Sequence, residues 1–505
     1  MTALLKRRYT HLLLAIGCWL LAVGCTSSDV TDSAPGAVEP AADVAVTFDS
    51  YLQRTAEGTR ATYPDATWGV MDNSKLRATS FGVFAHYTGS STFDYDAAGN
   101  GAVPYNFMWN QQVEYSDDKW TYTPVKYWPN DNREADKDGA MGSQEHSYVS
   151  FFGYAPYIAA AELPSTEEEK AAADGIIYMT DNTAAAGKGT GDDKGSYLTY
   201  RTNSTFPYDP DDNVDLLWAG KPNCYKMDDA GYGYVNGRVN LLFKHAQSLF
   251  TITVQGLFDH ADNDDDDIHY SDDRDMYTHI LVDKVEVSPL FEEGNMYFAP
   301  RPDDATVPYW EMNTSRPGNI TVDGAAVNST ISNTYVDGTE KKRWDDTSAA
   351  TMAASFLHLD DGAGADDALA LFKALPKGVS HEEVPLLDRG EYYYMVLPNK
   401  DYLALPENSS KKMTVHMVYY VITYDERLEL PKEGYPKYFS IVKNDVTATL
   451  QTFAFEPNKK YKLRLQPGLT TVKFEVSMVD GWDTPITLNP EVVDWVTVTK
   501  EYDVE

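Results

Sequence analysis

Short runs of alternating apolar residues recur along the chain, and they constrain its fold more than any other feature. In the first run Val44, Val46 and Phe48 alternate with other residues, which is the two-residue period of a strand with one buried face. Similar runs follow at residues 81–87, 120–128, 149–154, 248–255, 280–287, 392–397, 413–424, 461–465 and 471–478. Gly, Pro, Asn and Asp separate them, as the turns of a sandwich require. We therefore predict an all-β, mainly antiparallel fold.

Two segments depart from this pattern and are predicted to form short helices. In residues 165–173, Ser165 is a suitable N-cap, Glu168 follows three residues later, and acidic side chains favour the positive end of the helix dipole. Residues 366–375 form the second helix. Pro376 ends it, because proline lacks the backbone N–H that a helix needs.

The chain is strongly acidic. Among its 505 residues, 77 Asp and Glu outnumber 42 Lys and Arg, which gives a formal net charge of −35. Nucleic acid is not expected as a partner, because phosphate binding needs a basic surface. We interpret the acidity as favouring solubility through repulsion between molecules.

The N-terminus has the features of an export signal. A basic segment at residues 6–8 precedes an apolar stretch, residues 12–23, that is shorter than the roughly 20 residues needed to span a bilayer. Cys25 follows a glycine, and a small residue before a cysteine resembles the lipobox of bacterial lipoproteins. Cys18 is a second partial match with a much shorter apolar core. We expect residues 1–24 to be removed and Cys25 to carry lipid.

Lipid on Cys25 would hold the protein at a membrane surface. Residues 25–42 are small, polar and proline-containing, which is typical of a flexible tether. Once residues 1–24 are removed, the remaining cysteine is Cys224, so no intramolecular disulfide is expected.

The length of the chain favours more than one domain, since a domain has roughly 100–200 residues. Residues 300–342 carry many Asp, Pro, Asn and Thr and show little periodicity. We therefore place a boundary near residue 311, between an N-terminal domain of residues 43–311 and a C-terminal domain of residues 312–505.

The last segment, residues 486–505, is β-prone but has no strand after it to complete its pairing. It contains Val492, Val496 and Val498, whose even spacing would place their side chains on one face of a strand. Two interpretations are open. The segment either folds back as an edge strand of its own chain or is donated to another chain.

Several segments, taken in order, resemble the fimbrillin family, the subunits of type V pili on certain Gram-negative anaerobes. They are the lipobox at Cys25 and the segments VTFDSYLQ, TRAT, FGVFAHYT, NFMWN, WTYTPVKYWPND, SFFGYAPY, FKHAQSLFTITV, ILVDKVEVS and FEPNKKYKLRLQPGLTTVKFEVSMVDGW. Each segment alone is a weak signal. Together they cover most of the chain that follows the export signal.

The resemblance implies two β-sandwich domains in tandem, of transthyretin-like or Greek-key type, with a few short helices. It implies a structural protein rather than an enzyme, without metal or cofactor, exported through the periplasm to the outer membrane as a lipoprotein. Its partners would be other pilus subunits and an arginine-specific protease. Cleavage is expected between Arg60 and Ala61, which match the family's Thr-Arg-Ala, with Arg54 and Thr55 as the alternative.

The resemblance also implies polymerisation by strand exchange. Residues 43–60 would be the removable first strand and cleavage loop, and their loss would leave unpaired edges around an apolar groove. Burying Val44, Val46 and Phe48 is worth roughly 1.5–3 kcal/mol each, so an empty groove favours an incoming strand. The donor strand would carry Val492, Val496 and Val498.

Other patterns suggest chemistry, and each has a simpler interpretation. Residues 259–275 have the carboxylate density of a calcium loop without the EF-hand spacing, which favours a solvated hairpin tip and leaves calcium binding open. Residues 187–191 lack the spacing of a phosphate-binding loop. Residues 380–383, Ser-His-Glu-Glu, are adjacent in sequence, whereas a catalytic triad is assembled by the fold. His86 and His416 lie in predicted strands without metal-ligand spacing.

A competing function is a surface lipoprotein that binds glycans without polymerising. Exposed aromatic rings can stack on sugars, and the candidates are Trp109, Trp120, Trp128 and the Tyr-Gly-Tyr of residues 232–234. The simpler interpretation places these rings in the core and in cross-strand pairs of a sandwich. An enzyme is the third possibility.

Overall fold

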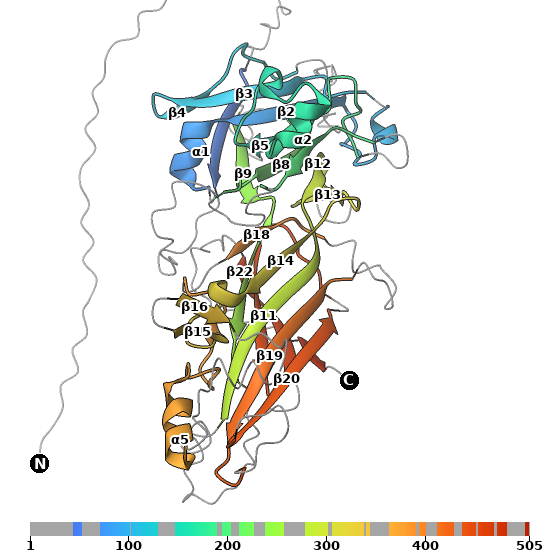
Figure 1. The fold of residues 1–505 in the computed structure, drawn as a ribbon. Coiled ribbons are helices and arrows are strands. Elements are labelled where there is room, and N and C mark those ends of the chain that lie inside the picture. The colour runs from blue at the N-terminus through green and yellow to red at the C-terminus, as the bar shows by residue number, and fades with distance from the viewer. Residues whose placement is uncertain are drawn as a thin grey trace, which may run out of the picture. The chain divides into compact units, whose positions relative to one another are not determined.

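Figure 1 shows the fold, which comes from a computed structural model. The chain divides into two units, Met1–Ala42 and Asp43–Glu505, and all described residues belong to the second. The structure describes residues 44–52, 71–101, 103–129, 147–188, 194–203, 212–226, 238–256, 278–300, 306–337, 340–343, 363–389, 393–399, 412–428, 437–450, 453–468, 472–481 and 500–503.

Two sheets form the layers of a first sandwich. The seven-stranded sheet has the order β1-β9-β8-β5-β2-β3-β4. Its strands are β1 (Thr47–Leu52), β2 (Phe81–Gly89), β3 (Met108–Ser116), β4 (Lys119–Thr121), β5 (Tyr148–Ala155), β8 (Leu217–Cys224) and β9 (Arg238–His245). The facing sheet has the order β13-β12-β7-β6, with β6 (Gly175–Met179), β7 (Tyr197–Arg201), β12 (Glu293–Pro300) and β13 (Pro308–Met312). Phe84, Phe152 and Trp218 from the first sheet meet Leu198 and Met296 from the second in one buried cluster.

Two further sheets form a second sandwich. A six-stranded sheet has the order β17-β10-β21-β22-β23, with β18 also pairing with β10. Its strands are β10 (Ser248–Val254), β17 (Val384–Pro385), β18 (Tyr394–Val396), β21 (Lys459–Pro467), β22 (Val472–Gly481) and β23 (Lys500–Asp503). The facing sheet has the order β14-β11-β19-β20, with β11 (Thr278–Phe291), β14 (Pro317–Asp323), β19 (Thr414–Tyr424) and β20 (Phe439–Thr449). Ile252 and Leu463 from one layer meet Val285 and Met417 from the other.

Few elements lie outside these four sheets. β15 (Thr334–Asp337) and β16 (Glu340–Arg343) form a two-stranded ribbon. The short helices are α1 (Asn73–Thr79), α2 (Glu167–Ala172), α5 (Ala365–Ala374) and the 3-10 turns η1 (Ala98–Asn100), η2 (Ala160–Glu162) and η4 (Gly324–Ala326). Among the described residues, the strand pairs are antiparallel except β1 with β9 and β10 with β21. The predicted mainly antiparallel β fold with a few short helices is therefore confirmed.

The seven-stranded sheet is buried on both faces. In β5, Phe152 faces the sandwich core, whereas Phe151 belongs to a second cluster with Phe81 and Val83 on the opposite face. Alternate residues of a strand point to opposite faces. Burial of both faces therefore explains why β2 and β5 carry apolar side chains at nearly every position instead of at every second one.

Strand pairing crosses the boundary predicted near residue 311. β10 and β11 precede that residue, yet they pair with β21 and β19, which follow it. At the end of β11, Leu290 lies in the core of the second sandwich and the next residue, Phe291, lies in the core of the first. The sheets are thus shared between the two halves of the sequence, and the division into two domains at this residue remains a prediction.

The predicted helices form, with one correction. α5 ends at Ala374, before Pro376 as predicted. α2 is capped one residue later than predicted, because the side chain of Thr166, rather than Ser165, accepts a hydrogen bond from the backbone of Glu169. The carboxylate of Glu169 in turn accepts a hydrogen bond from the backbone N–H of Thr166, which completes a capping box.

The strand predicted over residues 120–128 is also too long. β4 ends at Thr121, and the following segment contains Pro124. Proline cannot donate to a strand ladder, so regular pairing stops there. The rest of the run contacts the first strand, as described below.

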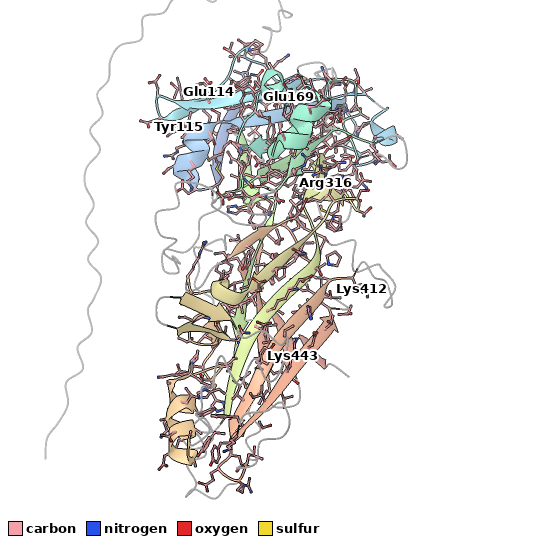
Figure 2. All side chains as sticks on the ribbon, viewed as in Figure 1. Glu114, Tyr115, Glu169, Arg316, Lys412 and Lys443 are labelled. Carbon is pink, nitrogen blue, oxygen red and sulfur yellow. The ribbon has the colours of Figure 1, made fainter. Side chains whose placement is uncertain are left out.

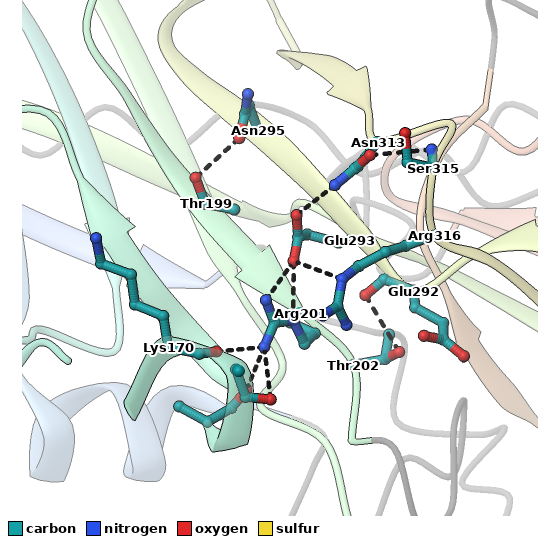
Figure 3. Close-up of polar contacts among 12 residues, drawn as sticks. Lys170, Thr199, Arg201, Thr202, Glu292, Glu293, Asn295, Asn313, Ser315 and Arg316 are labelled. Carbon is teal, nitrogen blue, oxygen red and sulfur yellow. Dashed lines mark hydrogen bonds and ion pairs between the residues drawn. The ribbon is translucent and has the colours of Figure 1, made fainter. Parts of the chain in front are cut away.

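A buried ion pair between Arg201 of β7 and Glu293 of β12 connects their sheet to α2 (Figure 3). The Arg201 guanidinium donates to Glu293 Oε2 from Nε at 2.8 Å and from Nη2 at 2.6 Å, and both side chains are largely buried. Its Nη1 donates to the carbonyl oxygens of Lys170 and Ala173 at the end of α2. Asn313 Nδ2 donates to Glu293 Oε1 at 2.6 Å. Arg201 therefore donates hydrogen bonds both to the terminal carbonyl oxygens of α2 and to a buried carboxylate.

Replacing Glu293 should destabilise the fold because it leaves the Arg201 charge buried without a counter-charge. We expect Glu293→Gln to lower the free energy of unfolding by about 3–5 kcal/mol, measured by denaturant titration. The matched control is Glu167→Gln, whose partner Lys170 lies at 2.8 Å and whose own side chain is 86% exposed. This variant should cost about 1 kcal/mol or less. Equal losses in the two variants would contradict the structural role assigned to the buried pair.

Candidate functional site: the first strand and its slot

The first strand, β1, lies at one edge of the seven-stranded sheet. It runs parallel to β9, in a register from Thr47 opposite Arg238 to Leu52 opposite Phe243. Parallel neighbours cannot be joined by a tight hairpin. β1 is therefore held in the sheet by residues far away in the sequence and by no local turn.

Two side chains of the first strand complete a buried cluster. Val46 is 1% exposed and Phe48 is 3% exposed, whereas Thr47 between them is exposed. The Phe48 ring lies edge-on to Tyr122, Phe151 and Phe81, at centroid distances of 5.5, 5.8 and 6.1 Å. This is the favourable geometry for aromatic pairs. Burial of Val46 and Phe48 on one face is as predicted.

Val44 continues the same face at the start of the segment. It is half-buried and packs against the cluster that contains Val46 and Phe48. Its carbonyl oxygen accepts a hydrogen bond from the backbone N–H of Trp128 at 2.9 Å. The three predicted residues thus line one side of the segment, and Val46 and Phe48 are more buried than Val44.

Residues 120–128 form a second wall, opposite β9. Val46 N donates to Lys126 O at 2.9 Å, and Ala45 forms an antiparallel bridge with Tyr127. Side chains contribute too, because Tyr122 Oη donates to Val46 O at 2.9 Å and Trp120 Nε1 donates to Ser50 O at 3.0 Å. We call the space between β9 and residues 120–128 the slot.

Sequence reasoning missed the second wall. The aromatic run from Trp120 to Trp128 predicts a strand, and nothing in its periodicity shows that it contacts residues 44–50. Burial raises the pKa of the Tyr122 hydroxyl. That hydroxyl therefore stays protonated and donates to the backbone of the first strand throughout the physiological pH range.

The chain is anchored independently where it re-enters the described fold at Met71. Met71 N donates to Asp215 Oδ2 at 2.6 Å, and the same oxygen lies 2.7 Å from His245 Nδ1 at the end of β9. Asp215 and His245 are both buried. Leu76 of α1 lies in the cluster that the first strand completes. The segment after residue 70 therefore has one anchor, the bond of Met71 to Asp215, that does not involve β1.

Several predicted site residues lie outside the described part of the chain and stay predictions. They are the lipidation residue Cys25, the cleavage residues Arg54, Thr55, Arg60 and Ala61, and the donor residues Val492, Val496 and Val498. The same holds for the acidic segment 259–275 and for residues 232–234.

The described part of the C-terminus lies on the six-stranded sheet. β22 pairs antiparallel with β21, and the short β23 pairs antiparallel with β22 from Lys473 opposite Asp503 to Val476 opposite Lys500. Residues 500–503 therefore follow the fold-back interpretation of the terminal segment.

The residues whose types suggest catalysis or metal binding have structural partners. Glu383 pairs with Lys462 at 3.0 Å and with Arg464 at 2.8 Å, which ties β21 to the segment before β17. His86 is buried, lies 3.1 Å from Pro104 O through Nδ1, and has its pKa lowered by burial. His416 Nε2 contacts Asp445 Oδ1 at 2.7 Å. Within the described residues no cluster of His, Cys, Asp and Glu is arranged to hold a metal ion.

Cys224 and Lys188 also have defined surroundings in the structure. Cys224 is a fully buried thiol in β8, and its Sγ lies 3.4 Å from Lys221 O. Lys188, from the glycine-rich segment, places Nζ 3.5 Å from the centroid of the Tyr309 ring. In the described ranges no helix combines the length and the apolar content of a membrane span.

The aromatic residues proposed for glycan stacking are mostly core residues. Trp128 is fully buried, and Trp120 is buried against Phe81 at a centroid distance of 4.8 Å. Trp109 is half-buried and packs edge-on to Phe84. These tryptophans fill space in the sandwich, as the simpler interpretation has it.

Loss of the Phe48 ring should destabilise the protein before any cleavage. Phe48→Ala removes a buried ring with three aromatic neighbours, and we expect a loss of about 3–5 kcal/mol in the free energy of unfolding, measured by denaturant titration. Thr47→Ala, one residue away on the exposed side, should cost less than about 1 kcal/mol. A Phe48 variant as stable as the Thr47 variant would show that the first strand does not complete the core.

Comparison with known proteins gives one sequence match and several structural ones. No family model matches the chain. Fimbrium subunit Fim1C of Phocaeicola vulgatus is 26% identical over 157 residues, which is 31% of this chain and 33% of that protein. The chain thus matches about a third of the length of this relative.

Solved structures of low sequence identity also align with the chain. A fimbrial protein from Bacteroides vulgatus aligns with a TM-score of 0.46 and 17% identity, covering 87% of this chain and all of that chain. The tip fimbrial protein Mfa3 from Porphyromonas gingivalis aligns with a TM-score of 0.27 and 9% identity, covering 80% and 94%. The sequence match to a fimbrium subunit supports the resemblance stated from the motifs, and the chain is fimbrillin-like.

Proposed function

We propose that the chain is a structural subunit of a cell-surface fimbria, and that its first strand is exchanged for a strand of a neighbouring subunit. The match to a fimbrium subunit supports a structural or adhesion role at the cell surface. The single observation that carries the strand-exchange proposal is the placement of β1. It is an edge strand with one buried apolar face, it runs parallel to β9, and it fills the slot without a hairpin to either wall.

Removing the first strand would leave a binding site rather than an unfolded chain. Val46 and Phe48 would leave an apolar space worth roughly 1.5–3 kcal/mol per side chain to refill. The backbone groups of β9 and of residues 126–128 would lose their partners, which favours an incoming strand. The anchor of Met71 on Asp215 would keep the downstream chain in place.

The cleavage that frees the strand is proposed at Arg60, before Ala61, with Arg54 and Thr55 as the alternative. Both arginines lie in the sequence between β1 and Met71. A cut at either position separates the first strand from the rest of the subunit. The agent would be an arginine-specific protease.

The donor strand is proposed in residues 486–505. Val496 and Val498 are two residues apart, as are Val46 and Phe48, so they would enter the slot on one face. The short pairing of β23 with β22 opposes this step, because those four residues would have to leave their own sheet. The free energy gained by filling the slot of the neighbouring subunit must therefore exceed the cost of breaking the pairing of β23 with β22.

The assembly proposal predicts a loss of polymers when the donor segment is removed. Deleting residues 490–505 should leave folded, cleaved monomers, because no donor strand is then available to fill the slot. Unboiled samples on denaturing gels should show ladders for the cleaved wild-type protein and a single band for the deletion. Ladders of normal length from the deletion protein would place the donor strand elsewhere.

A matched pair of substitutions separates side-chain insertion from general damage. Val496→Asp should mimic the deletion, because it would put a charge into an apolar slot. Thr497→Asp, on the opposite face of a strand, should have a milder effect. Added peptide 490–505 should raise the melting temperature of the cleaved deletion protein by mass action.

The protein is further proposed to reach the outer membrane as a lipoprotein acylated at Cys25. The precursor should incorporate labelled palmitate, and Cys25→Ala should abolish the label, because the lipid is attached to that thiol. Cys18→Ala is the control and should keep the label. Labelling that persists without Cys25 would show that the anchor is elsewhere.

A further inference from the structure

Among the described strands, the last one of the β14-β11-β19-β20 sheet has no partner on its outer edge. β20 is 11 residues long and pairs with β19 over its whole length without a shift in register. Figure 1 shows it at the margin of the sheet, and Figure 2 labels Lys443 on it. In the part of the chain that the structure describes, no strand pairs with its other side.

Other sheet edges are blocked in ways that proteins use to prevent unwanted strand pairing. β4, β15, β16, β17, β18 and β23 have only two to four residues. β14 begins at Pro317, β13 begins at Pro308, and the ladder of β6 is interrupted by a shift in register. The residues that lead into β1 pair with residues 126–128, and Trp120 Nε1 donates to Ser50 O within β1. β20 has neither a proline nor a bulge.

The charges on β20 restrict what can pair with it. Lys443 and Asp445 lie on one face of the strand, with Asn444 between them on the other. Charged residues on an edge disfavour pairing with an arbitrary strand, and like charges directly opposite each other are destabilising. The side chain of Asp445 is 62% exposed, and its bond to His416 uses one oxygen, Oδ1.

In one antiparallel register, a second copy of β20 places unlike charges opposite each other. Centring the pair on Lys443 would oppose lysine with lysine, and centring it on Asp445 would oppose aspartate with aspartate. Centring it on Asn444 places Lys443 of each copy opposite Asp445 of the other, which gives two cross-strand ion pairs. The strand is thus self-complementary about its middle residue.

The apolar side chains agree with the same register. Val442 is 48% exposed, the largest exposed fraction among the aliphatic side chains of β20. Centring on Asn444 places Val442 opposite Val446 of the other copy, and Val446 already packs against the core of the second sandwich. Each exposed Val442 would then be covered by Val446 of the other copy. The two-fold axis makes this contact occur twice.

We propose that β20 pairs with β20 of a second copy of this chain, antiparallel about a two-fold axis at Asn444. Such a contact uses the same surface on both partners and therefore closes as a pair, unlike head-to-tail strand exchange. It goes beyond the proposed function and would join subunits side by side. The net charge of −35 opposes association at long range, so the contact needs salt near 0.15 M, where the screening length is about 8 Å.

Charge exchange tests the register. Sedimentation velocity of the full-length protein at about 0.15 M salt should show a concentration-dependent dimer. Lys443→Asp and Asp445→Lys should each be monomeric, because like charges then oppose each other. An equimolar mixture of these two variants should dimerise, since each supplies the charges that the other lacks. A wild-type protein that stays monomeric, or a mixture that stays monomeric, would overturn the proposal.

Cross-linking tests the position of the axis. Directly opposite residues of an antiparallel pair have Cα atoms about 4.5–5.5 Å apart, within the range of a disulfide. Asn444→Cys should therefore give a covalent dimer on mild oxidation. Ser440→Cys is the matched control on the same face, and it should stay monomeric because its counterpart would lie roughly 26 Å away at about 3.3 Å per residue. Equal cross-linking at both positions, or at neither, would contradict this register.

Discussion

The parallel pairing of β1 with β9 is the constraint on which the functional account depends. It places Val46 and Phe48 among the rings of Tyr122, Phe151 and Phe81, so the strand is part of the core. It also leaves the strand without a hairpin, because parallel neighbours need a long connection. A segment can therefore be essential to packing and still have no tight turn that joins it to its neighbours in the sheet. These two properties suit a strand that is replaced rather than merely lost.

The rest of the first sandwich has contacts that do not involve the first strand. β9 is followed by β10 after two residues, Ala246 and Gln247. Trp310 Nε1 donates to Ala246 O at 2.8 Å, and Asn458 N donates to Gln247 O at 2.9 Å. β10 then pairs with β21 in the second sandwich. The strand that borders the slot is thus fixed at its far end by both halves of the sequence, which would keep the slot open for a new strand.

Local sequence patterns predict much of this fold, and their limits have physical causes. Alternation of Val44, Val46 and Phe48 predicts a strand with one buried face, because side-chain direction depends only on neighbouring residues. The same pattern cannot show that β1 runs parallel to β9 or that residues 120–128 form its second wall, since both depend on contacts distant in sequence. The predicted boundary near residue 311 has the same limit, because β10 and β11 choose partners more than a hundred residues away.

The most direct test of the account is amide hydrogen exchange in β9, followed by mass spectrometry, before and after cleavage of the protein that lacks residues 490–505. If β1 is a separable occupant of the slot, cleavage after Arg60 should speed exchange in Arg238–His245, and added peptide 490–505 should slow it again. Exchange in β5, in the centre of the sheet, should change little. If β9 is equally protected before and after cleavage, the first strand does not leave the slot and the central claim is wrong.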